Sequence, residues 1–192
     1  MELNDAYWES RYQENTTGWD LGAASEPIVN YLKSLSNKEL KILIPGCGNA
    51  YEAEWALNNG FKNVHILDFA ASAIENFKLR FPAFKIENLH HEDFFKHQGS
   101  YDLIIEQTFF CAINPDKRKE YAKKMHSLLL DNGVLAGLFF DTTFVNGPPF
   151  GGSKEEYLTY FSSNFDMLHF ETCYNSIPPR AGKELFIELR KK

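Results

Sequence analysis

The sequence predicts an α/β protein with a doubly wound, mostly parallel sheet, and two observations carry this prediction. Short apolar runs rich in β-branched residues alternate with longer amphipathic segments along the 192-residue chain. Several of the short runs are apolar throughout, which is typical of strands buried on both faces of a parallel sheet. The length fits one domain, 1–192, and neither an internal repeat nor a linker divides it.

The order of the predicted elements follows from these patterns. Strands of the parallel part are predicted at 41–44, 63–67, 84–87, 101–105 and 133–140. Helices are predicted near 51–60, 70–80, 115–131 and 153–164. The last two runs, 166–173 and 184–190, follow each other without an intervening helix, which predicts an antiparallel hairpin at one edge of the sheet.

The N-terminal segment 1–24 precedes the predicted core and is unusually aromatic. Trp8 and Tyr12 are four residues apart, so a helix here would carry both on one face, and Trp19 follows in the loop T-T-G-W-D. These rings are either a staple that packs over the sheet or a lid that recognises a ligand.

Charge and cysteine content narrow the class of partner. Twenty basic against 26 acidic residues give a net charge of −6, and no stripe of Lys or Arg could follow a phosphate backbone, so nucleic acid is not expected. Cys47, Cys111 and Cys173 are widely spaced and lack a C-x-x-C pair, which predicts a reducing cytoplasm rather than a disulfide framework.

The N-terminus also argues against export and membrane insertion. It is acidic and polar where a signal peptide would be basic and then apolar. No apolar run approaches the ~20 residues that span a bilayer. We therefore expect a soluble protein with no membrane partner.

The turn after the first strand, within K-I-L-I-P-G-C-G-N-A-Y, has the spacing of a nucleotide site. Gly46 and Gly48 let the backbone approach a ligand closely, and Asp68 ends the second strand, where its carboxylate can accept from ribose hydroxyls. Tyr51 stands where a dinucleotide motif needs a third small residue, which disfavours NAD and leaves S-adenosylmethionine. A purely structural turn beside an incidental acidic residue is the alternative.

The stretch H-H-E-D-F-F-K-H follows the third predicted strand. His90, His91 and His97 could suggest a metal, but adjacent side chains diverge and the spacing matches no familiar zinc site, so no metal is expected. Asp93 directly before Phe94 instead suits an adenine pocket, with a hydrogen-bond acceptor beside an apolar slot.

Several motifs together resemble one enzyme family. They are W-E-S-R-Y, G-W-D, I-P-G-C-G-N-A-Y-E-A, I-L-D, D-F-F, F-F-C-A-I-N-P followed by R-K-E-Y-A, and G-P-P-F. Their order and spacing over nearly the whole chain resemble the thiopurine S-methyltransferase family. Within it, F-F-C-A-I and I-P-P-R-A-G-K-E are more similar to the methyl halide and thiol methyltransferase branch.

The resemblance implies a Rossmann-like class I methyltransferase with a seven-stranded sheet, S-adenosylmethionine as donor and a small thiol, thiocyanate or halide as acceptor. It implies cofactor contacts at Trp8, Tyr12, Trp19, Gly46, Asp68, Asp93, Phe94 and Gln107. Two of these depart from the family pattern. Tyr12 replaces a common tryptophan, and Gln107 stands where thiopurine enzymes usually carry arginine and halide-type enzymes often carry tyrosine.

The acceptor site is expected at the same edge of the sheet. Phe109, Phe110 and Phe150 are the predicted walls, with core packing as the alternative. Arg180 is the candidate for attracting an anion, with a solvated loop charge as the alternative. No catalytic base is required of such an enzyme, because a thiolate or halide needs no deprotonation. A cofactor-binding regulator without turnover and an NAD-dependent oxidoreductase remain the alternative functions, and no oligomeric state is predicted.

Overall fold

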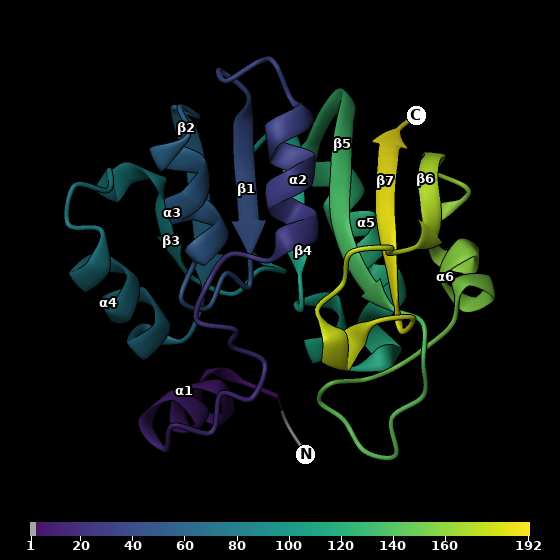
Figure 1. The fold of residues 1–192 in the computed structure, drawn as a ribbon, viewed down its shortest axis with the longest axis horizontal. Helices are drawn as coiled ribbons and strands as arrows, with labels where there is room; N and C mark the ends of the chain where they lie inside the picture. The colour runs from purple at the N-terminus through teal and green to yellow at the C-terminus, as the bar shows by residue number, and fades with distance from the viewer. Residues whose placement is uncertain (1–2) are drawn as a thin grey trace.

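A seven-stranded sheet runs through the computed structural model, which describes residues 3–192 (Figure 1). The strands are β1 (Lys41–Pro45), β2 (Asn63–Asp68), β3 (Leu89–His91), β4 (Tyr101–Gln107), β5 (Leu129–Phe140), β6 (Phe165–Thr172) and β7 (Glu184–Lys191). Their order is β3-β2-β1-β4-β5-β7-β6. The first five strands are parallel, whereas β7 is antiparallel to both β5 and β6, so the predicted mostly parallel sheet with an antiparallel hairpin is confirmed.

The centre of the sheet is β1, which pairs in parallel with β2 on one side and with β4 on the other. The chain therefore winds outward in opposite directions from β1 and β4. In such sheets the carboxyl ends of the two central strands leave a crevice between the connections that diverge from them. The fold thus prepares a ligand site at the ends of β1 and β4.

Helices cover both faces of the sheet (Figure 1). One face carries α2 (Glu26–Ser34), α3 (Tyr51–Asn58) and α4 (Ala71–Arg80), and the other carries α5 (Arg118–Leu128) and α6 (Lys154–Phe161). Short 3₁₀ turns are η1 (Ile86–Asn88), η2 (Phe110–Ala112), η3 (Pro115–Lys117) and η4 (Pro178–Arg180). Alternate residues of β1 serve the two cores: Ile42 and Ile44 face the first helix layer and Leu43 the second.

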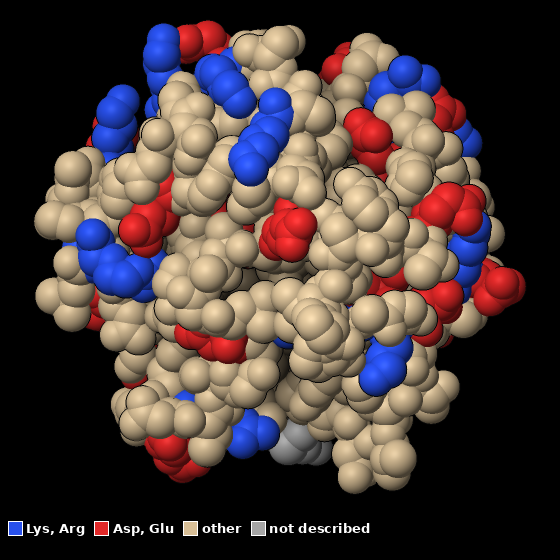
Figure 2. All heavy atoms as spheres, in the orientation of Figure 1, with Lys and Arg blue, Asp and Glu red and all other residues tan. Residues whose placement is uncertain are grey.

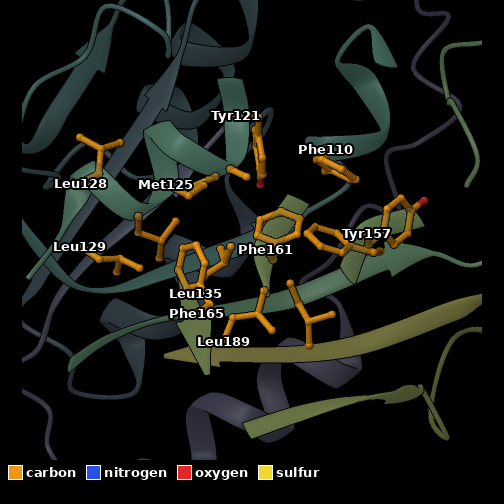
Figure 3. Packing of buried hydrophobic residues seen from close by; sticks show 14 of the residues in the cluster. Phe110, Tyr121, Met125, Leu128, Leu129, Leu135, Tyr157, Phe161, Phe165 and Leu189 are labelled. Carbon is orange, nitrogen blue, oxygen red and sulfur yellow. The ribbon is translucent and has the colours of Figure 1, made fainter. Parts of the chain in front are cut away.

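The core under α5 and α6 is built largely from aromatic rings (Figure 3). Phe110 lies at its middle, with its ring centroid 4.4 Å from that of Phe139 and 4.9 Å from that of Tyr121. Tyr157 packs edge-on against Phe110 at 5.2 Å. Its hydroxyl donates to the Phe140 carbonyl at 2.6 Å, which satisfies the polar end of a buried ring.

The predicted strand at 84–87 is wrong. In a strand, Phe84 and Ile86 would lie on the same face. Instead, the Phe84 ring lies edge-on against Phe77 of α4 at 4.9 Å, while Ile86 is 66% exposed in η1. The true strand, β3, begins at Leu89 and pairs with β2 from Ile66 onward.

Two other boundaries differ from the sequence prediction. The helix α2 was not predicted, although Ser25 precedes it at the N-cap position, Pro27 lies in its first turn and Ile28 and Leu32 are buried four residues apart. The helix predicted over 115–131 ends at Leu128, because Leu129 already pairs with Tyr101 of β4.

The N-terminal helix α1 (Asp5–Gln13) lies beyond the carboxyl ends of the strands and contacts α4 of the first helix layer (Figure 1). The Asn4 side chain caps it by accepting from the Tyr7 N–H at 3.0 Å. No residue of α1 is buried. Among residues 3–192, no helix has the length and apolar character needed to cross a bilayer.

The position of Phe110 predicts a stability effect. We expect Phe110→Ala to lower the free energy of unfolding by about 3–5 kcal/mol, because it leaves a cavity among closely packed rings. Urea denaturation of wild type and variant measures this. Phe150→Ala is the comparison, since that side chain is only partly buried and should cost clearly less. Equal losses would contradict the core assignment.

Candidate active site

A cavity of about 1420 Å³ opens between α1 and the carboxyl ends of β1, β2 and β4. Most of the predicted site residues line it: Trp8, Tyr12, Trp19, Gly46, Asp68, Asp93, Phe94, Gln107, Phe109 and Arg180. The cavity thus brings together residues from the two ends and the middle of the chain.

The glycine turn after β1 forms the floor of the cavity. Gly46 and Gly48 have φ of 57° and 52°, in the left-handed region that favours glycine. A Cβ on Gly46 would lie 2.1 Å from Cδ2 of Phe109, and one on Gly48 would lie 2.8 Å from the Tyr12 hydroxyl. Both glycines are therefore required by backbone conformation and by the close approach of these rings.

Asp68, at the end of β2, forms hydrogen bonds with both the glycine turn after β1 and the turn that leads into α4. One carboxylate oxygen accepts from the Gly48 N–H at 2.8 Å and the other from the Ala70 N–H at 2.9 Å. Burial raises the pKa of Asp68, and the two backbone donors oppose that rise. Each oxygen has further acceptor capacity, which suits hydroxyl donors of a ligand.

The rings of Trp8, Tyr12 and Trp19 form one cluster over this floor. The Trp19 ring lies edge-on to Trp8 at 5.3 Å and to Tyr12 at 5.8 Å. Burial and the nearby Asp68 carboxylate raise the pKa of Tyr12, which keeps its hydroxyl neutral. An uncharged aromatic surface therefore faces the glycine turn.

Polar contacts fasten this N-terminal segment to the body of the protein. Glu9 of α1 accepts from the hydroxyl and from the N–H of Ser72, in the first turn of α4, the latter at 3.0 Å. Asp20 accepts from the side-chain amide of Asn49 in the glycine turn. These links span residues far apart in sequence and hold α1 across the cavity.

Asp93 and Phe94 lie beside the cavity directly after β3. The Asp93 carboxylate accepts from the Phe95 N–H at 2.9 Å, which orients the turn. Phe94 is buried and packs edge-on against Phe109 at 5.1 Å. The two residues thus combine an acceptor and an apolar wall, the arrangement expected for an adenine pocket.

Glu106, next to the cavity, was missed by the sequence analysis. It is fully buried on β4, and its carboxylate accepts from the Phe109 N–H at 2.8 Å, from the Phe110 N–H at 2.9 Å and from the Tyr121 hydroxyl. Burial raises its pKa to about 7. An acidic residue inside the apolar strand Y-D-L-I-I-E-Q was the available signal.

Gln107 follows Glu106 and lines the cavity. Its Oε1 is buried and has no hydrogen-bond partner within residues 3–192. An orphaned acceptor of this kind fits a ligand that brings N–H or O–H donors. Together with the free acceptor capacity of Asp68, it makes the cavity chemically suited to an adenosine-containing cofactor.

Two of the residues predicted to wall the methyl-acceptor site, Phe110 and Phe150, lie outside the cavity. Phe110 is buried in the core and does not reach the cavity. The Glu106 carboxylate accepts from the N–H groups of both Phe109 and Phe110, and the backbone held in this way directs the two rings to different sides. Phe150 lines a separate hollow of about 220 Å³. Hydrogen bonds from Arg118 hold the backbone of Phe150 at that place. The Arg118 guanidinium donates to the carbonyl of Phe150 at 3.4 Å and to that of Gly151 at 2.8 Å.

Arg180 does reach the cavity, and it brings partners that the sequence did not suggest. Its guanidinium lies over the Phe140 ring at 5.7 Å and 3.5 Å from the Glu184 carboxylate. It also donates to the Trp19 carbonyl at 3.2 Å. Phe144 packs edge-on against Phe140 at 5.0 Å, so this end of the cavity combines aromatic rings with the cation of Arg180. Phe140, which ends an apolar strand, could have been found from its position at the carboxyl edge.

Comparison with known proteins identifies the family. The model of the thiopurine S-methyltransferase (TPMT) family matches residues 3–186. A probable thiol methyltransferase 2 of Arabidopsis thaliana is 31% identical over 190 residues, which is 95% of this chain and 84% of that protein. Thiocyanate methyltransferase 1 of the same plant is 32% identical over 191 residues, 95% of this chain and 83% of that protein.

Solved structures agree on the fold. The Burkholderia thailandensis 1,6-didemethyltoxoflavin-N1-methyltransferase, solved with S-adenosylhomocysteine bound, has a TM-score of 0.73 at 18% identity. The match covers 99% of this chain and 88% of that chain. These matches favour a methyltransferase over an NAD-dependent oxidoreductase and over a regulator without turnover. The chain belongs to the thiopurine S-methyltransferase family and is an S-adenosylmethionine-dependent methyltransferase.

Proposed function

We propose that this enzyme methylates a small thiol, thiocyanate or a halide ion. The observation that carries the proposal is the aromatic end of the cavity, where the guanidinium of Arg180 lies over Phe140 and is partly offset by the Glu184 carboxylate. Such a pocket suits a small, polarisable anion that has lost its water shell. The thiol and thiocyanate methyltransferases matched over 95% of the chain support the same class of acceptor.

The cofactor would lie on the glycine turn, under α1. Asp68 would accept from the ribose hydroxyls, Asp93 and Phe94 would border the adenine, and Gln107 would offer its orphaned oxygen. The full set of proposed cofactor contacts is Trp8, Tyr12, Trp19, Gly46, Asp68, Asp93, Phe94 and Gln107. Phe109, Phe140, Phe144 and Arg180 are the proposed acceptor walls.

Methyl transfer to such an acceptor depends more on the position of the acceptor than on proton transfer. S-adenosylmethionine, when bound, supplies a methyl group that the sulfonium charge has already activated. Holding the acceptor in line with that group can lower the barrier by about 7–11 kcal/mol. The aromatic rings of the N-terminal segment exclude water and can stabilise a nearby cation by about 0.5–2 kcal/mol each.

A catalytic base is not needed for this class of acceptor. Thiocyanate and halides carry no proton to lose, and a thiol with a pKa near 8.5 is a few per cent thiolate at neutral pH. The segment 1–24 then acts as a lid whose closure completes the site. A reducing cytoplasm is the proposed location, since Cys47, Cys111 and Cys173 are all free thiols.

An acceptor panel tests the proposal. We expect turnover with hydrosulfide, thiocyanate and iodide, and little with a thiopurine. Arg180→Gln should lower kcat/KM for thiocyanate by about 10-fold to 100-fold, as expected for losing a charge-assisted contact worth about 1.5–3 kcal/mol. Arg190→Gln is the matched control, since this partly exposed arginine of β7 pairs with Asp166 of the edge strand β6 and lies outside the cavity. Binding of S-adenosylhomocysteine without methylation of any small acceptor would refute the acceptor class.

Asp68 provides a test of the cofactor site. S-adenosylhomocysteine at a hundred times its dissociation constant should stabilise the wild type by about 2.7 kcal/mol. We expect Asp68→Asn to weaken that binding by at least about 1.5–3 kcal/mol, because it removes a charged acceptor. The loss can be larger, since the same carboxylate also orders the N–H of Gly48. Calorimetry measures the affinity, and an unchanged value would mean that Asp68 does not contact the cofactor.

The lid assignment predicts that stability and activity separate. Deleting residues 1–20 should leave the sheet folded, because no residue of α1 is buried and α2 begins only at Glu26. Methyl transfer should fall far more than the melting temperature, since closure and water exclusion are lost. Glu9→Ala, which releases α1 from Ser72, should show a smaller version of the same effect. Normal turnover by the truncated chain would mean that the segment only packs on the protein and does not act as a lid.

A further inference from the structure

A cluster of imidazole and carboxylate groups lies where β3 leads into the loop 92–97. One ligand atom from each of His90, Glu92 and His97 can be chosen so that all three lie within 4.8 Å of one another. Nδ1 of His97 is 2.7 Å from Oε1 of Glu92, and Nδ1 of His90 is 3.9 Å from the same oxygen. Three potential metal ligands therefore converge on one point.

The second nitrogen of His90 is fixed by an outer chain of hydrogen bonds. Nε2 of His65 is 3.0 Å from Oδ1 of Asn63, a carbonyl oxygen that can only accept, so His65 carries its proton there. Nδ1 of His65 must then accept from Nε2–H of His90, 3.0 Å away. A neutral His90 is left with a lone pair on Nδ1, directed toward the Glu92 carboxylate.

His97 is oriented in the same manner. It is 1% exposed, and its Nε2 lies 2.8 Å from the hydroxyl of the buried Tyr101. Nδ1 of His97 donates to the Glu92 carboxylate at 2.7 Å, so a metal would have to displace this proton, and the Tyr101 hydroxyl could then accept the proton carried on Nε2. Histidines that bind metals typically hold their second nitrogen in such an outer hydrogen bond.

We propose that His90, Glu92 and His97 form a binding site for a divalent transition metal of the zinc type. Two imidazole nitrogens and one carboxylate oxygen are a ligand set that zinc accepts, with the remaining position left to water. Two acceptors facing each other at 3.9 Å, His90 Nδ1 and Glu92 Oε1, are the arrangement that a cation satisfies. The site is independent of the proposed acceptor.

This proposal revises the expectation of no metal, which had weighed His91 as the third ligand. His90 and His91 do diverge, as that argument assumed, since Nε2 of His91 is 3.2 Å from the Phe69 carbonyl oxygen. Glu92 takes the third place instead. The loop 92–97 carries Asp93 and Phe94, so a bound metal would hold the border of the cofactor cavity against β3.

The charge of Glu92 is decisive for such a site. Two ammonium groups lie near the cluster: Lys41 over the Tyr101 ring at 4.8 Å, and Lys124, which donates to the His97 carbonyl. A dication beside these two groups needs a carboxylate ligand to offset them. Glu92→Gln removes the charge but keeps an amide oxygen that can accept from the buried His97, so it tests the charge with little disturbance of the core.

Metal titration of the untagged, EDTA-treated full-length protein tests the site. We expect one Zn²⁺ per chain by calorimetry, a rise in melting temperature and saturable Co²⁺ absorption. Glu92→Gln and His90→Gln should abolish saturable binding, and His65→Gln should weaken it by about 10-fold to 100-fold through the outer hydrogen bond, while His91→Gln stays within about twofold of wild type.

Several outcomes would overturn the proposal. Absence of saturable binding in the wild type would leave the cluster as a hydrogen-bond network only. Binding that survives Glu92→Gln at full affinity, or that falls equally in His91→Gln, would assign the metal elsewhere. A thiolate charge-transfer band with Co²⁺ would point to a cysteine such as the half-buried Cys47.

Discussion

The buried carboxyl of Glu106 sets the path of the chain after β4, and both the core and the cavity depend on that path. Its oxygens accept from the N–H groups of Phe109 and Phe110 and from the Tyr121 hydroxyl. Burial raises the pKa of this carboxyl, and the three donors oppose that rise by stabilising its charged form. Phe109 is thereby sent toward the glycine turn and Phe110 into the core. The neighbouring strand leaves room only for Gly137, where a Cβ would lie 2.1 Å from the Glu106 carbonyl oxygen.

The two halves of the cavity are held by interactions of different strength. Asp68 accepts two backbone N–H groups and is almost fully buried, so the floor of the cavity is rigid. The helix α1 has no buried residue and is held by polar contacts, such as that of Glu9 with Ser72, together with edge-on aromatic contacts. Exposed polar links of this kind contribute little net stability each. Under the proposed lid function, a segment held in this way would open to admit a cofactor and close again without unfolding the sheet.

The far end of the cavity comes from three separate parts of the chain. Phe140 ends β5, Phe144 lies in the loop that follows, and Arg180 belongs to η4 near the C-terminus. The Glu184 carboxylate, whose pKa burial raises, partly offsets the charge of Arg180. On the face seen in Figure 2, basic and acidic side chains are interspersed and no extended basic patch appears. The positive charge available to an acceptor is therefore local to the cavity.

The sequence by itself determined the alternation of strands and helices, the glycine turn with Asp68, and the family motifs, because each is encoded by residues close together or by a fixed spacing. It could not separate Phe109 from Phe110. Their directions are decided by hydrogen bonds to Glu106 and by a positive φ of 56° at Thr108, both maintained by packing against α5 and β5. The predicted strand at 84–87 is wrong for a related reason. The alternation of apolar and polar residues suggested a strand, but the packing of Phe84 against Phe77 of α4 decides the structure there. The stretch that holds His90, Glu92 and His97 was visible in the sequence, but the choice of Glu92 over His91 was not, because it depends on His91 turning toward the Phe69 carbonyl and on His97 turning toward Tyr101.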